Sequence, residues 1–207
     1  MLAFGIPVLD QMVSSARVVV IYGEAGAGKT TLAFQALLTT LAEGGAGLLA
    51  LSEPAAADRL ADMAGEQWES VAERIYICEL KRLSDLEELV EVAGELGDLR
   101  MVVVDGVDRI YRGAVGDFEK NVVASRMLNE QLSRLRAIAY GREIDLVETV
   151  GVTVGRTPVA GEVVLRYADL ALEIADLGGD LRLLKVTRPC CLFEAKLKLG
   201  RRGFTAL

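Results

Sequence analysis

Residues 23–30 read Gly-Glu-Ala-Gly-Ala-Gly-Lys-Thr, which is the phosphate-loop spacing GxxxxGK[ST]. This spacing indicates a phosphate site when it follows a strand and opens a helix. Both conditions are met, because the apolar, β-branched run 17–22 precedes the loop and the helix-patterned segment 29–42 follows it. The stretch therefore predicts a site for a nucleoside triphosphate, with ATP and Mg²⁺ as the expected ligands.

The residue types of this loop suit the binding of phosphates. Glycine permits positive φ and leaves backbone N–H groups free to bind phosphate oxygens at the positive end of the following helix. Lys29 is expected to bridge the β- and γ-phosphates, Thr30 to ligate Mg²⁺ and Thr31 to contact the α-phosphate. The residues expected to contact the nucleotide before them are Gly23, Glu24, Ala25, Gly26, Ala27 and Gly28.

Two acids follow apolar strand-like runs and complete the expected site. Asp105 follows the run 100–104, at the strand end where ligands of open α/β sheets bind, so it is expected to hold Mg²⁺ through water. Asp108 is the weaker candidate, since it could equally cap a helix. Glu53 follows the run 46–51 and is expected to position the attacking water. Its alternative interpretation is a surface acid that caps the next helix.

Apolar strand-like runs alternate with helix-patterned segments over the first 150 residues. Apolar strands joined by helical crossovers require a parallel sheet that is covered on both faces. The expected strands are 17–22, 46–51, 74–78, 100–104 and 144–147, and the expected helices are 29–42, 55–63, 83–96 and 122–140, with a loop between 105 and 122.

The last quarter of the chain changes character. Segments 169–175, 181–186 and 192–199 are strand-like and are separated by turn signals, which predicts antiparallel strands added to the edge of the sheet. The predicted fold class is therefore α/β, a P-loop NTPase core with a mostly parallel central sheet flanked by helices. No linker-like stretch interrupts it, so residues 1–207 are expected to form a single domain.

Composition narrows the function classes further. The apolar share of 52% is ample for one core, yet no apolar stretch reaches the roughly 18 residues of a membrane span. The N-terminus does not have the pattern of a secretory signal, so a cytoplasmic location is expected. The chain has no His and no CxxC pair, which argues against zinc or iron. Cys78, Cys190 and Cys191 are interpreted as small apolar fillers, with a redox role left open.

The charge distribution leaves two interpretations open. A net charge of −7 argues against a surface that binds nucleic acid all over. From residue 181 onward, however, the chain contains seven Lys or Arg residues and a single acid, Glu194. This segment is either a solvated basic face or a surface for nucleic acid or an acidic partner.

The order of these motifs resembles the RecA family of ATPases, and within it the archaeal RadA and RadB group. The guanine-reading motif Asn-Lys-x-Asp is absent, which also favours ATP. The resemblance implies a RecA-like core and implies that Arg59, in an "ERL"-like segment, packs on the adenine. The segments that carry it are 5–10, 52–53 with 58–60, 105–112, 124–139, 158–161 with 166–169, and 185–190 with 194–195.

Several departures from the family pattern bear on function. The amide-bearing "NQ" sensor is replaced by Glu148-Thr149-Val150, and residues 151–157 are short for a second DNA-binding loop. The acid expected near residues 187–189 is missing, and no N-terminal helical domain or Phe-x-x-Ala segment is present. The departures indicate a core-only paralogue in which the coupling of ATP to DNA is reduced.

Three functional hypotheses remain at this stage. The first is a RadB-like, slow ATPase that assists DNA recombination or repair through single-stranded DNA or a RadA-type recombinase, with the formation of a homo-oligomer left open. The second is a KaiC-like regulatory ATPase that acts through a protein partner. The third is a nucleotide-binding scaffold without turnover.

Overall fold

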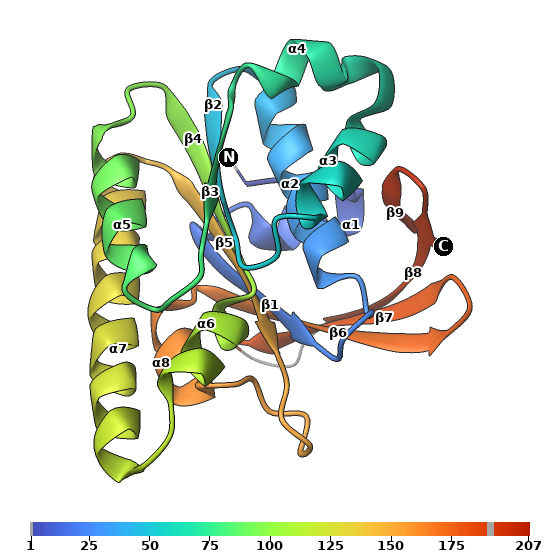
Figure 1. Cartoon of the computed structure of the whole chain (residues 1–207). Helices are drawn as coiled ribbons and strands as arrows, with labels where there is room; N and C mark the ends of the chain where they lie inside the picture. Colours follow the sequence, from blue (N-terminus) through green and yellow to red (C-terminus); the bar gives the residue numbers. More distant parts are fainter. Residues whose placement is uncertain (1, 190–192) are drawn as a thin grey trace.

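In the computed structural model, which describes residues 2–189 and 193–207, a single nine-stranded sheet has the order β3-β2-β4-β5-β1-β6-β7-β8-β9 (Figure 1). The sheet thus places the phosphate-loop strand β1 near its middle. The strands are β1 (Val18–Gly23), β2 (Ala46–Leu51), β3 (Ile75–Glu79), β4 (Leu99–Asp105), β5 (Asp145–Gly151), β6 (Leu170–Gly178), β7 (Leu181–Arg188), β8 (Phe193–Gly200) and β9 (Gly203–Ala206).

Strands β1 to β5 pair in parallel, as the sequence predicts. Strand β6 was expected to be the first of the antiparallel strands, but it pairs in parallel with β1, and the antiparallel pairing begins between β6 and β7. Every residue of β1 and β2 is buried, because helices cover both faces of this half of the sheet. The carboxyl ends of β1, β2, β4 and β5 meet at one edge. Residues that follow these strands therefore come together there.

Two helical layers enclose the parallel strands (Figure 1). The layer on one face packs around the phosphate-loop helix, and the layer on the other face packs around the longest helix. The first contains α1 (Pro7–Val13), α2 (Lys29–Ala42), α3 (Ala56–Ala64), the 3₁₀ turn η1 (Gly65–Gln67) and α4 (Trp68–Ala72); the second contains α5 (Asp85–Glu95), α6 (Val107–Ala114), α7 (Phe118–Gly141) and α8 (Gly161–Tyr167).

The C-terminal strands extend the sheet in antiparallel fashion, from β6 through β7 and β8 to β9. The last of them, β9, returns to α2: the Gln35 amide accepts from the Phe204 N–H at 2.6 Å and donates to the Phe204 carbonyl at 3.0 Å. These strands thus reach back to the helix that opens at the phosphate loop.

The structure corrects the predicted element list in three places. The segment between 105 and 122, expected as a loop, contains helix α6 and the start of α7. Helices α1, α4 and α8 and strand β9 were not expected. Strand β5 continues to Gly151 rather than ending at residue 147, so Glu148 and Thr149 lie within the sheet. No helix among the described residues is long and apolar enough to cross a membrane.

Candidate nucleotide site

The phosphate loop joins β1 to α2, the strand–loop–helix context that its motif requires. Gly26 and Gly28 have φ values of +77° and +104°, a region that glycine adopts without strain. Gly28 is the N-cap of α2, so the loop ends at the positive end of a 14-residue helix. The glycines thus shape the loop in the way phosphate binding needs.

A cavity of about 260 Å³ lies beside this loop at the carboxyl edge of the sheet. Lys29 and Thr30 of α2 line it together with Glu53 and Asp105. Four residues that are far apart in sequence therefore surround one space. The cavity is also lined by Ser52, Gly106, Asp108, Arg109, Arg112 and Thr149, together with Ala25, Gly26, Gly151 and Val152.

Thr30 and Asp105 are in direct contact in the lining of the cavity. The Thr30 hydroxyl lies 2.9 and 3.1 Å from the two carboxylate oxygens of Asp105, and the Thr149 hydroxyl donates to Asp105 Oδ1 at 2.6 Å. Burial raises the pKa of the Asp105 carboxyl, against the opposing effect of these hydroxyl donors and of Lys29. A bound cation would offset the cost of burying this carboxylate.

These groups fit Mg²⁺ by the chemistry of their donors. A hydroxyl and a carboxylate are hard oxygen ligands, and Mg²⁺ in nucleotide sites takes one or two protein oxygens plus phosphates and water. No cluster of three or more His, Cys, Asp or Glu suited to a metal occurs among the described residues. Thr30 and Asp105 would therefore hold Mg²⁺ together with a nucleotide rather than alone.

Lys29 is folded over the loop. Its ammonium donates to the carbonyl oxygens of Gly23 at 3.0 Å and Glu24 at 2.8 Å. Burial lowers the pKa of Lys29, Asp108 and Asp105 act to raise it, and Arg109 acts to lower it. The lysine thus lies in the electrostatic field of the acids at the end of β4 and in the first turn of α6.

Glu53 forms an ion pair with Arg109 of α6. The helix after Pro54 has Ala55 at its N-cap and no side-chain capping bond, so the interpretation of Glu53 as a helix cap is wrong. Asp108 is not a cap either, since the N-cap of α6 is Gly106. Its carboxylate instead accepts from the Gly151 N–H at 2.7 Å, which joins α6 to the end of β5.

Some predicted contact residues lie outside the lining of this cavity, namely Gly23, Glu24, Ala27, Gly28, Thr31 and Arg59. Arg59 donates to the carbonyl oxygens of Arg201 at 2.7 Å and Gly200 at 3.2 Å, so it holds the turn between β8 and β9. Thr31 is buried in the first turn of α2. The adenine contact of Arg59 and the α-phosphate contact of Thr31 stay predictions.

Sequence reasoning missed two residues that contact the phosphate loop from the C-terminal strands. Arg182, assigned only to the basic C-terminal segment, is 6% exposed, and its Nε donates to the Ala27 carbonyl at 3.1 Å. The Phe204 ring packs on Gly28, where an added Cβ would lie 2.6 Å from Phe204 Cζ. The period-two alternation of Arg182 with the buried Leu184 was the available signal for its position.

The remaining basic residues of this segment do not form a uniform positive face. Lys185 pairs with Glu194 at 2.6 Å, and Lys198 pairs with Asp180 at 3.3 Å. Cys78 is partly buried on β3, where burial raises its thiol pKa to about 11, as suits an unreactive filler. Cys190 and Cys191 lie outside the described residues.

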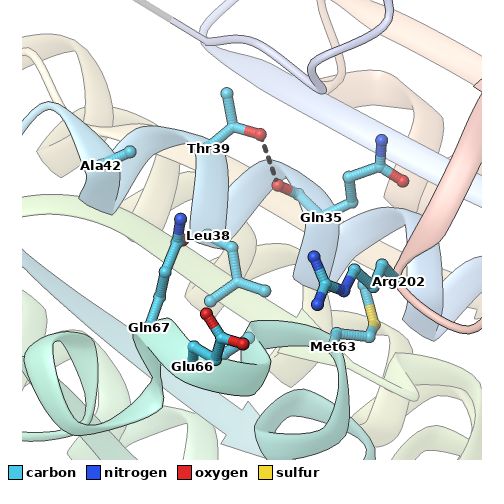
Figure 2. A pocket seen from close by; sticks show the side chains of 9 residues that line it. Gln35, Leu38, Thr39, Ala42, Met63, Glu66, Gln67 and Arg202 are labelled. Carbon is cyan, nitrogen blue, oxygen red and sulfur yellow. Dashed lines mark hydrogen bonds between the residues drawn. The ribbon is translucent and has the colours of Figure 1, made fainter.

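A second, larger groove of about 410 Å³ lies away from the phosphate loop (Figure 2). Its lining side chains come from α2, from the segment of α3 and η1, and from the turn before β9. They include Leu38, Met63, Glu66 and Arg202, and none belongs to residues 23–30. Size alone therefore does not locate the nucleotide site.

Comparison with known proteins gives two kinds of relative. The chain is 29% identical over 133 residues to the DNA repair and recombination protein RadB of Methanococcoides burtonii, a match of 62% of this chain and 58% of that protein. It is 27% identical over 180 residues to Protein RecA of Thermus thermophilus, a match of 81% of this chain and 52% of that protein. The matched segments span little more than half the length of these relatives. No family model matches the sequence.

Proposed function

Since this chain is a RadB-like relative of the RecA/RadA family, we propose that it binds ATP with Mg²⁺ in the phosphate-loop cavity and hydrolyses the nucleotide. The observation that carries the proposal is the convergence of Lys29, Thr30, Glu53 and Asp105 on one cavity. A strand-to-helix turn with a purely structural role does not require a lysine, a hydroxyl and two acids around one cavity, so the combination favours a ligand site.

Each residue has a role that its position suits. Lys29 would exchange the carbonyls of Gly23 and Glu24 for the β- and γ-phosphates, and Thr30 and Asp105 would hold Mg²⁺. Glu53 would orient a water molecule toward the γ-phosphorus. In hydrolysis the water oxygen forms a bond to the γ-phosphorus while the bond between the γ-phosphorus and the β–γ bridging oxygen breaks. The Glu53 carboxylate accepts the proton that the water loses.

The experiment compares nucleotide binding and phosphate release in three proteins. Wild type should bind Mg-ATP in calorimetry, Lys29→Ala should lose most of that affinity, and Glu53→Gln should keep the affinity but lose phosphate release. If the wild-type protein bound Mg-ATP no better than Lys29→Ala does, the proposed ATP site would be wrong. Unchanged release in Glu53→Gln would remove Glu53 from its role.

We further propose that the protein acts in DNA recombination or repair, through single-stranded DNA or a RadA-type recombinase. The support is the similarity to a DNA repair and recombination protein. Binding to single-stranded DNA through Lys and Arg should weaken steeply as salt rises, because counterions are released from the phosphates. Absence of DNA retention at low salt would leave the recombinase as the partner to test, by pull-down with purified components.

A further inference from the structure

Arg109 brings a second cation into the nucleotide cavity. It lies in the first turn of α6, which begins directly after Asp105 and Gly106 at the carboxyl edge of the sheet. Its side chain lines the same cavity as Lys29, and its charge acts on the Lys29 ammonium. No partner chain is needed to bring this guanidinium to the site.

The partner of Arg109 is Glu53, the acid assigned to the attacking water. The two side chains are in direct contact, and they are 57% and 55% exposed. An ion pair this exposed contributes about 0–1 kcal/mol, so a stronger anion can displace one of its members. While the pair is formed, the Glu53 carboxylate is engaged and is less able to polarise water.

The neighbouring Arg112 is held differently. Its Nε lies 3.8 Å from Asp108 Oδ2, and its Nη2 donates to the Val152 carbonyl at 3.2 Å. Asp108 in turn is fixed by the Gly151 N–H. Arg112 thus joins α6 to the end of β5, whereas among the described residues Arg109 forms its ion pair with Glu53, a residue that the proposed reaction needs free.

We propose that Arg109 is a γ-phosphate-sensing residue supplied by the same chain. Without nucleotide it holds Glu53. When ATP binds, Arg109 exchanges that carboxylate for the γ-phosphate, and Glu53 becomes free to orient water. The exchange is favoured because guanidinium–phosphate bonds are charge-assisted and can be bidentate. This inference rests on the proposed ATP site and adds to it a device that releases the water-positioning acid.

The device makes a specific distinction between nucleotides. ADP has no γ-phosphate, so the pair of Arg109 with Glu53 persists when ADP is bound. A cation beside the γ-phosphate also stabilises the charge that spreads over the phosphate oxygens during transfer. Arg109 should therefore contribute to ATP affinity and to turnover, and contribute little to ADP affinity.

The test measures the affinities of Mg-ADP and of a non-hydrolysable Mg-ATP analogue by calorimetry, with phosphate release as a second readout. Arg109→Ala should lower the affinity for the ATP analogue by roughly 10-fold or more, which is the loss expected for one charge-assisted contact. It should lower the affinity for ADP much less. Turnover should fall by on the order of 10³-fold. Arg109→Lys should restore part of the ATP preference. Arg126→Ala, an exposed change on α7, is the matched control and should leave both affinities unchanged.

The outcomes separate this inference from the proposed function. Wild type that binds neither nucleotide would overturn the ATP site itself. Wild type that binds ATP, together with an Arg109→Ala variant whose preference for ATP over ADP is unchanged, would overturn only the role of Arg109. An equal loss of affinity for the ATP analogue and for ADP would also overturn the role of Arg109, because that result indicates a general effect on the site.

Discussion

The carbonyl oxygen of Ala27, inside the phosphate loop, accepts a hydrogen bond of 3.1 Å from Nε of the buried Arg182 on β7. The same guanidinium donates to Asp176 Oδ1 at 2.9 Å and to the Gly179 carbonyl at 2.9 Å. The Arg182 side chain therefore ties the hairpin between β6 and β7 to the phosphate loop. A loop held in this way keeps its N–H groups in place before phosphate arrives, which is the preorganisation that tight binding needs.

Removal of the Arg182 guanidinium should affect both stability and binding. Arg182→Met keeps much of the apolar volume but leaves the Ala27 carbonyl without this donor, at a cost of about 1–3 kcal/mol in the free energy of unfolding. Urea denaturation would measure that cost, and calorimetry should show weaker ATP binding. Lys196→Ala, an exposed change on the neighbouring strand, is the control. Equal stability of Arg182→Met and the control would show that this hydrogen bond does not support the loop.

Gly28 and Phe204 form a second support. A methyl group at Gly28 would require positive φ in a non-glycine residue and would press on the Phe204 ring. Gly28→Ala should therefore lower Tm and weaken ATP binding by roughly 10-fold or more, given a backbone strain of about 1–2 kcal/mol plus the contact.

Gly44→Ala is the matched control, because that glycine has the same φ of +104° and open space around it. It should lower Tm by a smaller amount and leave ATP affinity unchanged. A Gly28→Ala protein that matches this control in both measurements would show that the ring does not constrain the loop.

The parts of the fold that sequence could predict are those with long, well-bounded periodicity. Helix α2 and strand β2 have the bounds expected for them, because glycines punctuate both segments. The missed helices α1, α4, α6 and α8 have five to eight residues, too few to be stable alone. They form because packing holds them, as when α6 buries Val107 and Ile110.

The same division applies to the candidate site. The convergence of Glu53 and Asp105 could be predicted, because carboxyl ends of parallel strands share an edge. The pair of Arg109 with Glu53 could not, since it depends on a helix that has no distinct pattern in the sequence. The contact of Arg182 with the loop joins residues 155 positions apart, and only the order of the strands brings them together.

Asp105 should lower the stability of the nucleotide-free protein and, in return, hold the metal ion when nucleotide binds. The residue is 6% exposed, and burial raises the pKa of its carboxyl, so an ionised Asp105 costs stability in the nucleotide-free protein. Asp105→Asn should raise Tm without nucleotide and weaken binding of Mg-ATP. Chelation of Mg²⁺ should reduce ATP affinity strongly in wild type and weakly in the variant. A variant with wild-type dependence on Mg²⁺ would exclude Asp105 as a metal-holding residue.

Glu148 gives a prediction on pH. It is fully buried on β5, and neither of its carboxyl oxygens has a hydrogen-bond partner among the described residues. Burial raises its pKa from 4.5 to about 8. The folded state therefore holds a proton that the unfolded state releases, so stability falls as pH rises from 4.5 to about 8 and is then constant. The slope from this group is at most about 1.4 kcal/mol per pH unit.

Replacement of Glu148 by Leu should remove this slope and raise the free energy of unfolding at pH 7 by a few kcal/mol, the cost of keeping the carboxyl protonated. Urea denaturation of both proteins at intervals from pH 5 to pH 9 gives the difference curve, in which the other titrating groups cancel. Glu148→Gln serves as the isosteric comparison: it also removes the titration but leaves a buried amide, so its pH profile should be flat at a lower stability than that of the leucine variant. Parallel profiles for wild type and both variants would mean that Glu148 is ionised or hydrated in the folded protein.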